Sequence, residues 1–225
     1  MNKLLCICPS RGRPQKAKQM VESFYRTSRL SHLILILDKD DETKEVYKTL
    51  IGDKCEICVN EDLLNYTEII NYFFKFYRSH EFYSVTNDDF FYHTESWDVK
   101  LIEEIKLSGK HGIAYGNDLL QGANLPTTSI VSREICDALG WLQMPKLHHL
   151  FGDNVWSAIG QKARCLHYRQ DVIIEHRHYF SKKVPADNTF LKTNSQEMYK
   201  KDESAFLDWL INDSHSDIEK VRKIL

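Results

Sequence analysis

The 225-residue chain contains no run of about 18 consecutive apolar residues, the length that a membrane-crossing helix needs. Its N-terminal apolar run, Leu4 to Cys8, is too short for a secretory signal, and no small-residue cleavage site follows it. These two absences predict a cytoplasmic protein with reduced thiols. The formal net charge of -2 excludes a global basic field for nucleic acid, so a nucleic acid is expected only as a local substrate.

The sequence also lacks the paired CxxC motifs that are typical of a zinc ribbon. Cys55 and Cys58 have CxxC spacing, but no second such pair accompanies them. Both lie in a run of strand character, where an offset of three residues places them on opposite faces. Buried small apolar side chains are therefore favoured over a zinc knuckle.

No internal repeat, low-complexity segment or linker divides the chain. Its hydrophobic fraction of 42% is enough for a sizeable core. The length alone allows one large domain or two small ones, and the lack of a linker favours one domain. From Gly112 onwards the apolar runs shorten and turn residues become frequent. After Tyr179 the chain turns polar, which is typical of a mobile loop or lid, and two amphipathic helices are expected to close it.

The first 40 residues have the pattern of a strand, a helix and a second strand. Strands are predicted over 4–8 and 33–37, and Pro14 is expected as the first helical residue. Ligands bind beyond the carboxyl ends of strands in open α/β sheets. Pro9, Ser10, Arg11, Arg13 and Asp38 are therefore expected where a nucleotide would bind. The alternatives are a solvated loop for the arginines and a helix cap for Asp38.

An acidic tip follows the predicted strand over 82–86. Asn87, Asp88 and Asp89 come directly after it, and carboxylates at a strand end are a common way to hold a divalent cation. The alternative is an ordinary turn, because Asn and Asp are frequent turn residues.

Further elements are predicted from periodicity and from turn residues. A broad apolar stripe over 66–77 indicates a core helix, and Gly140 is expected to end a short helix over 133–139. A third strand is expected over 55–59, and later strands over 112–115, 127–131, 165–168 and 172–178. Helices are also expected over 42–50, from Trp97, and around Asp153.

The order of these features resembles that of nucleotide-sugar glycosyltransferases of the GT-A fold. Four segments carry the likeness: residues 8–14, the run 33–38 with its acidic tail, the Asn87-Asp88-Asp89 tip followed by Trp97-Asp98, and Gly152-Asp153 followed by a strand that ends in Glu175-His176-Arg177-His178. The resemblance implies an α/β fold: one GT-A-like domain whose central mixed sheet is flanked by helices. A Rossmann-like half over 1–110 would bind the nucleotide sugar, residues 111–180 the acceptor, and 181–225 would form a polar loop and C-terminal helices.

The resemblance also implies a metal site. Asp89 looks like a direct ligand to Mn²⁺ or Mg²⁺, with Asp88 on the ribose or on a metal-bound water. His176 or His178 would complete the sphere, and an imidazole among oxygen ligands favours Mn²⁺ somewhat. The alternative for the two histidines is an ordinary hydrogen-bonded or solvated pair. The nucleotide sugar would contact Pro9, Ser10, Arg11, Arg13, Asp38, Asn87 and Asp88.

Asp153 matches the place of the catalytic base in inverting members of this fold. It would take the proton from the acceptor hydroxyl as that oxygen attacks the anomeric carbon. The alternative is an N-cap of the following helix. Trp141 and Trp156 are candidates to stack on an acceptor ring, with core packing as the alternative.

The sequence therefore predicts a metal-dependent, inverting glycosyltransferase. A UDP-sugar is the favoured donor, and the acceptor is a hydroxyl on a saccharide, a protein or a hydroxylated DNA base. One alternative is a nucleotidyltransferase that acts on a sugar phosphate, although the loop over 10–16 lacks the extra glycines that would cradle a triphosphate. A second is a non-catalytic carbohydrate or interaction module of the same fold.

Overall fold

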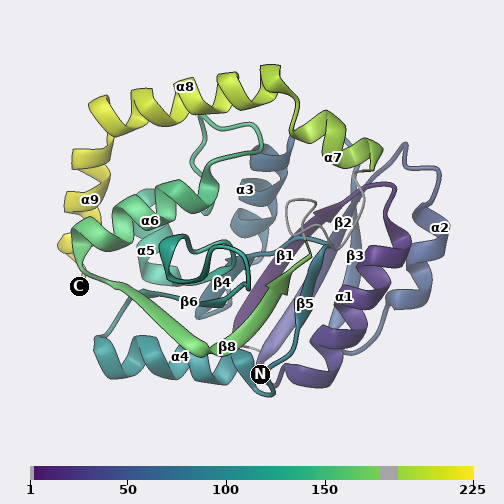
Figure 1. Ribbon diagram of the computed structural model, residues 1–225, viewed down its shortest axis with the longest axis horizontal. Coiled ribbons are helices and arrows are strands. Elements are labelled where there is room, and N and C mark those ends of the chain that lie inside the picture. Colours follow the sequence, from purple (N-terminus) through teal and green to yellow (C-terminus); the bar gives the residue numbers. More distant parts are fainter. Residues whose placement is uncertain (1–2, 178–186) are drawn as a thin grey trace.

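The computed structural model of the chain describes residues 3–177 and 187–225. In these residues an eight-stranded mixed sheet has the order β3-β2-β1-β4-β7-β6-β8-β5 and is flanked by helices (Figure 1). The strands are β1 (Leu4–Ser10), β2 (Ser31–Asp38), β3 (Cys55–Asn60), β4 (Phe82–Val85), β5 (Phe90–Tyr92), β6 (Ile113–Asn117), β7 (Ser129–Ser132) and β8 (Leu166–His176). The helices are α1 (Pro14–Thr27), α2 (Lys44–Tyr47), α3 (Tyr66–Phe76), α4 (Trp97–Ser108), α5 (Arg133–Leu139), α6 (Gly152–Ala163), α7 (Asn188–Thr193), α8 (Gln196–Asn212) and α9 (Ser214–Arg222), with short 3-10 turns at Lys48–Leu50 and Gly122–Asn124.

The N-terminal part of the sheet is parallel, as the strand–helix–strand pattern predicted. β2 pairs with β1 and β3, and β1 also pairs with β4, all in parallel. Their carboxyl ends therefore lie at one edge of the sheet. Asp38 is in register with Asn60 at the ends of β2 and β3, so the two polar residues lie side by side at the same edge of the sheet.

The C-terminal part makes the sheet mixed. β7 is antiparallel to both β4 and β6, whereas β8 is parallel to β6. The two strands predicted over 165–168 and 172–178 are one strand, β8, whose register shifts where Gly116 pairs with Arg169 and Asn117 with Ile173. The turn signals that separate them in the sequence mark this irregularity rather than a break.

Strand β5 was not predicted, because three residues carry almost no periodicity. Tyr92, Phe91 and Phe90 pair antiparallel with Ile174, Glu175 and His176 of β8. This pairing brings the residues that follow the acidic tip to the end of β8.

The sheet is covered on both faces, which explains the continuous apolar runs of β1 and β2. Leu4, Cys6 and Cys8 belong to one hydrophobic cluster together with residues of α1 and α4. Leu5 and Ile7 belong to a second cluster, which includes residues of α3, α5, α6, α8 and α9. The helices on each side of the strands are visible in Figure 1.

Local signals set several helix ends as expected. α1 begins at Pro14, and Gly140 ends α5 with a φ of 83° that favours glycine. Asn65 and Glu68 form a reciprocal capping box at the start of α3. Among the described helices none combines the length and apolar character needed to cross a membrane.

Candidate functional site

A cavity of about 680 Å³ opens at the carboxyl ends of the parallel strands. This volume is within the roughly 300–1,000 Å³ range of small-molecule sites. Ten of the residues singled out in the sequence line it together: Pro9, Ser10, Arg11, Arg13, Asp38, Asn87, Asp88, Asp89, Asp153 and Trp156. The predicted convergence of several loops therefore exists, because the parallel strands deliver their following residues to one edge.

The loop after β1 holds Asp88 in a dense polar network. Ser10 Oγ donates to Asp88 Oδ2 at 2.6 Å, and an Arg13 guanidinium nitrogen donates to Oδ1 at 3.2 Å. Tyr47 adds a third support, since its hydroxyl lies 2.9 Å from Ser10 Oγ and accepts from the backbone N–H of Arg13 at 2.9 Å. Burial raises the pKa of Asp88 to about 6, against the lowering effect of Arg13. Asp88 thus faces the cavity and is held in place there by Ser10 and Arg13.

Asp38 is bound from two sides at the end of β2. Its Oδ2 accepts from Arg11 at 2.7 Å, and its Oδ1 accepts from Asn60 Nδ2 at 2.7 Å. The residue that precedes α2 is Thr43, so the helix-cap alternative for Asp38 is wrong. Arg11 also contacts Asp40, so its side chain is paired with two carboxylates while 43% of it remains exposed to solvent.

Asn87 is oriented by the first residue of α3. The Tyr66 hydroxyl donates to Asn87 Oδ1 at 2.9 Å, and the Tyr66 ring lies with its centroid 4.4 Å from that of His149. Burial lowers the pKa of His149 from its ordinary value of 6.5 to about 4, although the Asp202 carboxylate acts in the opposite direction. A neutral imidazole therefore lines the cavity at physiological pH.

This lowered pKa predicts a specific pH dependence of stability. Because the folded chain binds the His149 proton less readily than the unfolded chain, the stability that this histidine contributes is complete above about pH 6.5. It is lost progressively towards about pH 4, by up to roughly 3 kcal/mol. His149→Asn should flatten this part of the profile in urea unfolding experiments. The exposed-residue control His215→Asn should retain it, and an unchanged profile in His149→Asn would contradict the assignment.

Asp89 and His176 lie next to each other across the β5–β8 pairing. His176 Nε2 is 3.5 Å from Asp89 Oδ1, and the backbone N–H of Arg177 donates to the Asp89 carbonyl at 2.9 Å. The cause is the strand register, in which Phe90 pairs with His176. The predicted partner His178 lies outside the described residues.

This pair fits a divalent cation in a limited way. A carboxylate oxygen and an imidazole nitrogen suit Mn²⁺, and a site with fewer protein ligands suits Mg²⁺ when phosphates and water complete it. In residues 3–177 and 187–225, no group of three or more His, Cys, Asp or Glu is placed to hold an ion. The part of the chain that the structure describes thus offers two ligands, and phosphate oxygens and water could complete the sphere.

Two other acidic or thiol motifs do not contribute to the site. Asp98 is fully buried at the start of α4, where it accepts from the backbone N–H groups of Arg29 and Leu30 and from Ser31 Oγ. Its role is to hold the loop before β2. The acid of the Trp97-Asp98 motif is therefore structural in this chain. Cys55 is buried in the core and Cys58 Sγ lies 3.6 Å from the Tyr77 hydroxyl, in keeping with the apolar alternative.

Asp153 lies in the first turn of α6 and lines the cavity. The N-cap position belongs to Phe151, so the capping alternative for Asp153 is wrong. Its Oδ1 accepts from the backbone N–H of Asn154 at 2.9 Å. Burial raises the pKa of Asp153, and this moves the carboxylate towards the range where a general base works near neutral pH.

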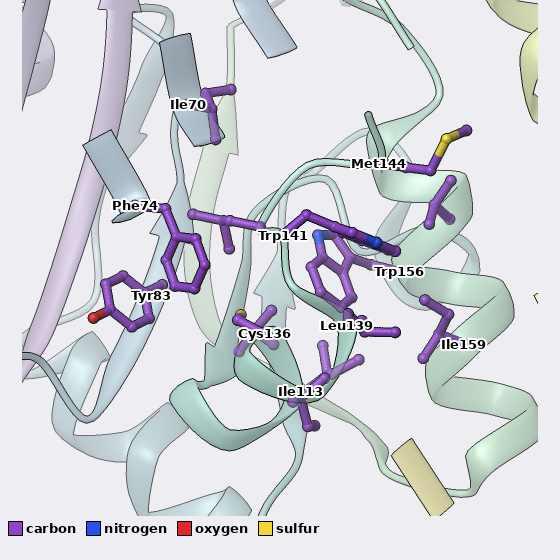
Figure 2. Packing of buried hydrophobic residues seen from close by; sticks show 14 of the residues in the cluster. Ile70, Phe74, Tyr83, Ile113, Cys136, Leu139, Trp141, Met144, Trp156 and Ile159 are labelled. Atoms are coloured by element: carbon purple, nitrogen blue, oxygen red, sulfur yellow. The ribbon is translucent and has the colours of Figure 1, made fainter. Parts of the chain in front are cut away.

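Trp141 and Trp156 pack against each other, with ring centroids 5.4 Å apart (Figure 2). Trp156 lines the cavity, whereas Trp141 is 7% exposed in the core and is not among the lining residues. Core packing, the alternative reading, thus describes Trp141. The acceptor role of Trp156 stays a prediction.

The C-terminal helices complete the cavity wall. Thr189 and Lys192 of α7 line it, and Thr189 Oγ1 donates to the Arg11 carbonyl at 3.1 Å. Figure 1 shows α7 beyond the ends of β1 and β2. Of the polar stretch expected to be a loop or lid, residues 181–186 lie outside the described residues. Its later part, 188–193, is helical.

Sequence reasoning missed several cavity residues. Asn60 had a usable signal, because it ends a predicted strand just as Asp38 does. Tyr66 was assigned to the core by its spacing. Gln143, His149 and Lys192 lie in loops or at helix ends, where no periodic pattern marks them.

The fold is shared with known nucleotide-sugar transferases. The chain is similar to mannosyltransferase PcManGT from Pyrobaculum calidifontis in complex with GDP-Man and Mn²⁺, with a TM-score of 0.62, 8% identity, and coverage of 97% of this chain and 72% of that one. It is also similar to S. aureus TarS 1-349 in complex with UDP, with a TM-score of 0.56, 11% identity, and coverage of 76% and 59%. The complex of TarS 1-349 with UDP-GlcNAc gives a TM-score of 0.56, 12% identity, and coverage of 93% and 73%.

These similarities define a GT-A-like fold, as the sequence pattern predicted. No protein-family model matches the chain, and no curated protein sequence matches it significantly. The aligned part spans 59% of the TarS fragment with UDP and 44% of a longer TarS chain. At identities of 8–12% the likeness establishes the fold, and the activity has to be argued from the site.

Proposed function

We propose that this protein is a glycosyltransferase that moves a sugar from a nucleotide-diphosphate donor to a hydroxyl acceptor. One observation carries the proposal: the Asp89–His176 pair, the polar strand ends and Asp153 surround or adjoin one cavity. A carboxylate–imidazole pair that can hold a cation, beside a cavity that also contains a carboxylate of raised pKa, supports transfer from a diphosphate leaving group.

The nucleotide sugar is assigned to the half of the cavity formed by residues 1–110. Arg11, Asp38 and Asn60 form a polar wall at the ends of β2 and β3, suited to the nucleoside. Asp89 and His176 would hold Mn²⁺ or Mg²⁺ there, and the ion supplies Lewis-acid stabilisation of the leaving diphosphate. We favour a UDP-sugar as donor. UDP and UDP-GlcNAc occur in the TarS complexes and GDP-Man in that of PcManGT, so both nucleotides belong in the test.

The acceptor is assigned to the half formed by residues 111–180. Asp153 would take the proton from the acceptor hydroxyl as its oxygen attacks the anomeric carbon from the face opposite the diphosphate. This displacement inverts the configuration. A saccharide, a protein hydroxyl and a hydroxylated DNA base are the acceptor classes that this chemistry allows.

Replacing Asp89 with asparagine tests the donor site without depending on turnover. We expect UDP binding in the presence of Mn²⁺ to weaken roughly 10- to 100-fold, the size typical of a disturbed metal site. Binding without a divalent ion should be equal or somewhat stronger, because asparagine keeps the shape of the side chain and removes a negative charge beside the diphosphate. Isothermal titration calorimetry at matched ionic strength measures both quantities.

The exposed residue Asp53 provides the matched control, since Asp53→Asn makes the same chemical change away from the cavity. Equal Mn²⁺-dependent UDP and GDP binding by Asp89→Asn and wild type would contradict the metal assignment. Release of pyrophosphate from a nucleoside triphosphate would support the nucleotidyltransferase alternative instead. A wild-type protein that binds neither UDP nor GDP would favour the non-catalytic alternative.

A further inference from the structure

The side chain of Gln143 is a buried amide without a protein partner. It is 4% exposed and lines the cavity. Within residues 3–177 and 187–225 its side-chain nitrogen and oxygen form no hydrogen bond. Neither amide atom is among the fully buried, unpaired polar atoms of these residues, so both remain accessible from the cavity and can bind a ligand there.

The surroundings hold the backbone of Gln143 in place. Asn71 of α3 clamps the backbone of Gln143, because its Oδ1 accepts from the Gln143 N–H at 3.0 Å and its Nδ2 donates to the Gln143 carbonyl at 2.7 Å. On the other side the amide packs against Gly152, where any Cβ would overlap with the Gln143 side chain. The amide end of Gln143 therefore lies directly against the backbone of Gly152.

This position places an amide donor and acceptor beside Asp153. Gly152 precedes Asp153 directly, and both residues line the same cavity as Gln143. If Asp153 faces the anomeric carbon and the attacking hydroxyl, the sugar ring of the donor would be the polar group nearest to the Gln143 amide. A sugar hydroxyl both donates and accepts, so it can satisfy either end of an amide.

We propose that Gln143 binds a hydroxyl of the donor sugar and contributes to the choice of sugar. The inference rests on the proposed function and adds to it a residue that selects the sugar rather than the nucleotide. A site built to hydrogen-bond a hydroxyl discriminates against ligands that lack one, because its own polar atoms then stay unpaired.

Gln143→Met tests the proposal, since methionine keeps the length of the side chain and removes both polar atoms. We expect binding of UDP-GlcNAc or GDP-mannose, whichever the wild type prefers, to weaken about tenfold, as loss of one hydrogen bond predicts. Binding of UDP or GDP alone should be unchanged. The melting temperature of the ligand-free variant should stay close to that of the wild type, because methionine keeps the length of the side chain and the amide forms no hydrogen bond that would be lost.

Gln161→Leu is the control, because Gln161 is exposed on α6 and bonds Ser157. It should leave all of these quantities at wild-type values. Suppose that Gln143→Met binds the nucleotide and matches the wild type in nucleotide-sugar affinity and in donor hydrolysis. This result would overturn the role of Gln143 and leave the proposed function standing. A lowered melting temperature with unchanged sugar binding would also overturn it, as a packing role predicts. Failure of the wild type to bind UDP or GDP would overturn the proposed function and this role together.

Discussion

Replacing Asp153 with asparagine is expected to lower kcat for sugar transfer by about 10²- to 10⁴-fold, the usual contribution of a general base. The amide is nearly the same size as the carboxylate, so donor binding should remain within about twofold of wild type. The reason is chemical: asparagine cannot accept the proton of the acceptor hydroxyl. Its backbone bond to Asn154 can persist through the amide oxygen.

The pH profile provides a second measurement of the same assignment. Burial raises the pKa of Asp153, and a base works only when it is deprotonated. Wild-type activity should therefore rise with pH through a midpoint above the ordinary value for an aspartate. This limb should be absent in Asp153→Asn.

The exposed residue Asp62 allows a matched control, because Asp62→Asn changes the same group on the surface. It should keep wild-type kcat and the wild-type pH profile. An Asp153→Asn enzyme with kcat within about threefold of wild type would exclude Asp153 as the base.

Replacing Asp202 with alanine is expected to lower the free energy of unfolding by roughly 3 kcal/mol. Asp202 is fully buried in α8, and its carboxylate accepts from the backbone N–H groups of His148, His149 and Leu150 at 2.8, 2.8 and 2.7 Å. Alanine would leave these groups without an acceptor. The loop they belong to leads directly to Gly152 and Asp153, so transfer activity should fall as well.

Asp208 lies on the same helix and serves as the comparison. It is 49% exposed and pairs with Lys146, so Asp208→Ala should lower the free energy of unfolding far less than Asp202→Ala does. Asp202→Asn should be intermediate, because it keeps one acceptor oxygen. Urea unfolding at neutral pH measures all three variants, and equal stability of Asp202→Ala and Asp208→Ala would contradict the bracing role of Asp202.

The parallel half of the fold was predictable because its signals are local. The apolar runs of β1 and β2 and the stripe of α3 reflect burial on both faces of a sheet. The carboxyl ends of the strands mark where side chains that can bind a ligand lie. Arg13, Asp38 and Asp88 could be assigned to one site from this rule alone. The fully buried Asp98 shows its limit, because an acid in a suggestive position serves the backbone of a neighbouring loop.

The sequence by itself determined the fold class and the strand ends that line the cavity, because burial and turn chemistry are encoded over a few neighbouring residues. Only the tertiary structure decided which distant groups meet. His176 reaches Asp89 through the register of β5 and β8, Asp202 braces a loop some fifty residues away, and Gln143 turns its amide to the cavity beside Gly152. Such contacts depend on packing between elements far apart in the chain, and no local pattern of residue types records them.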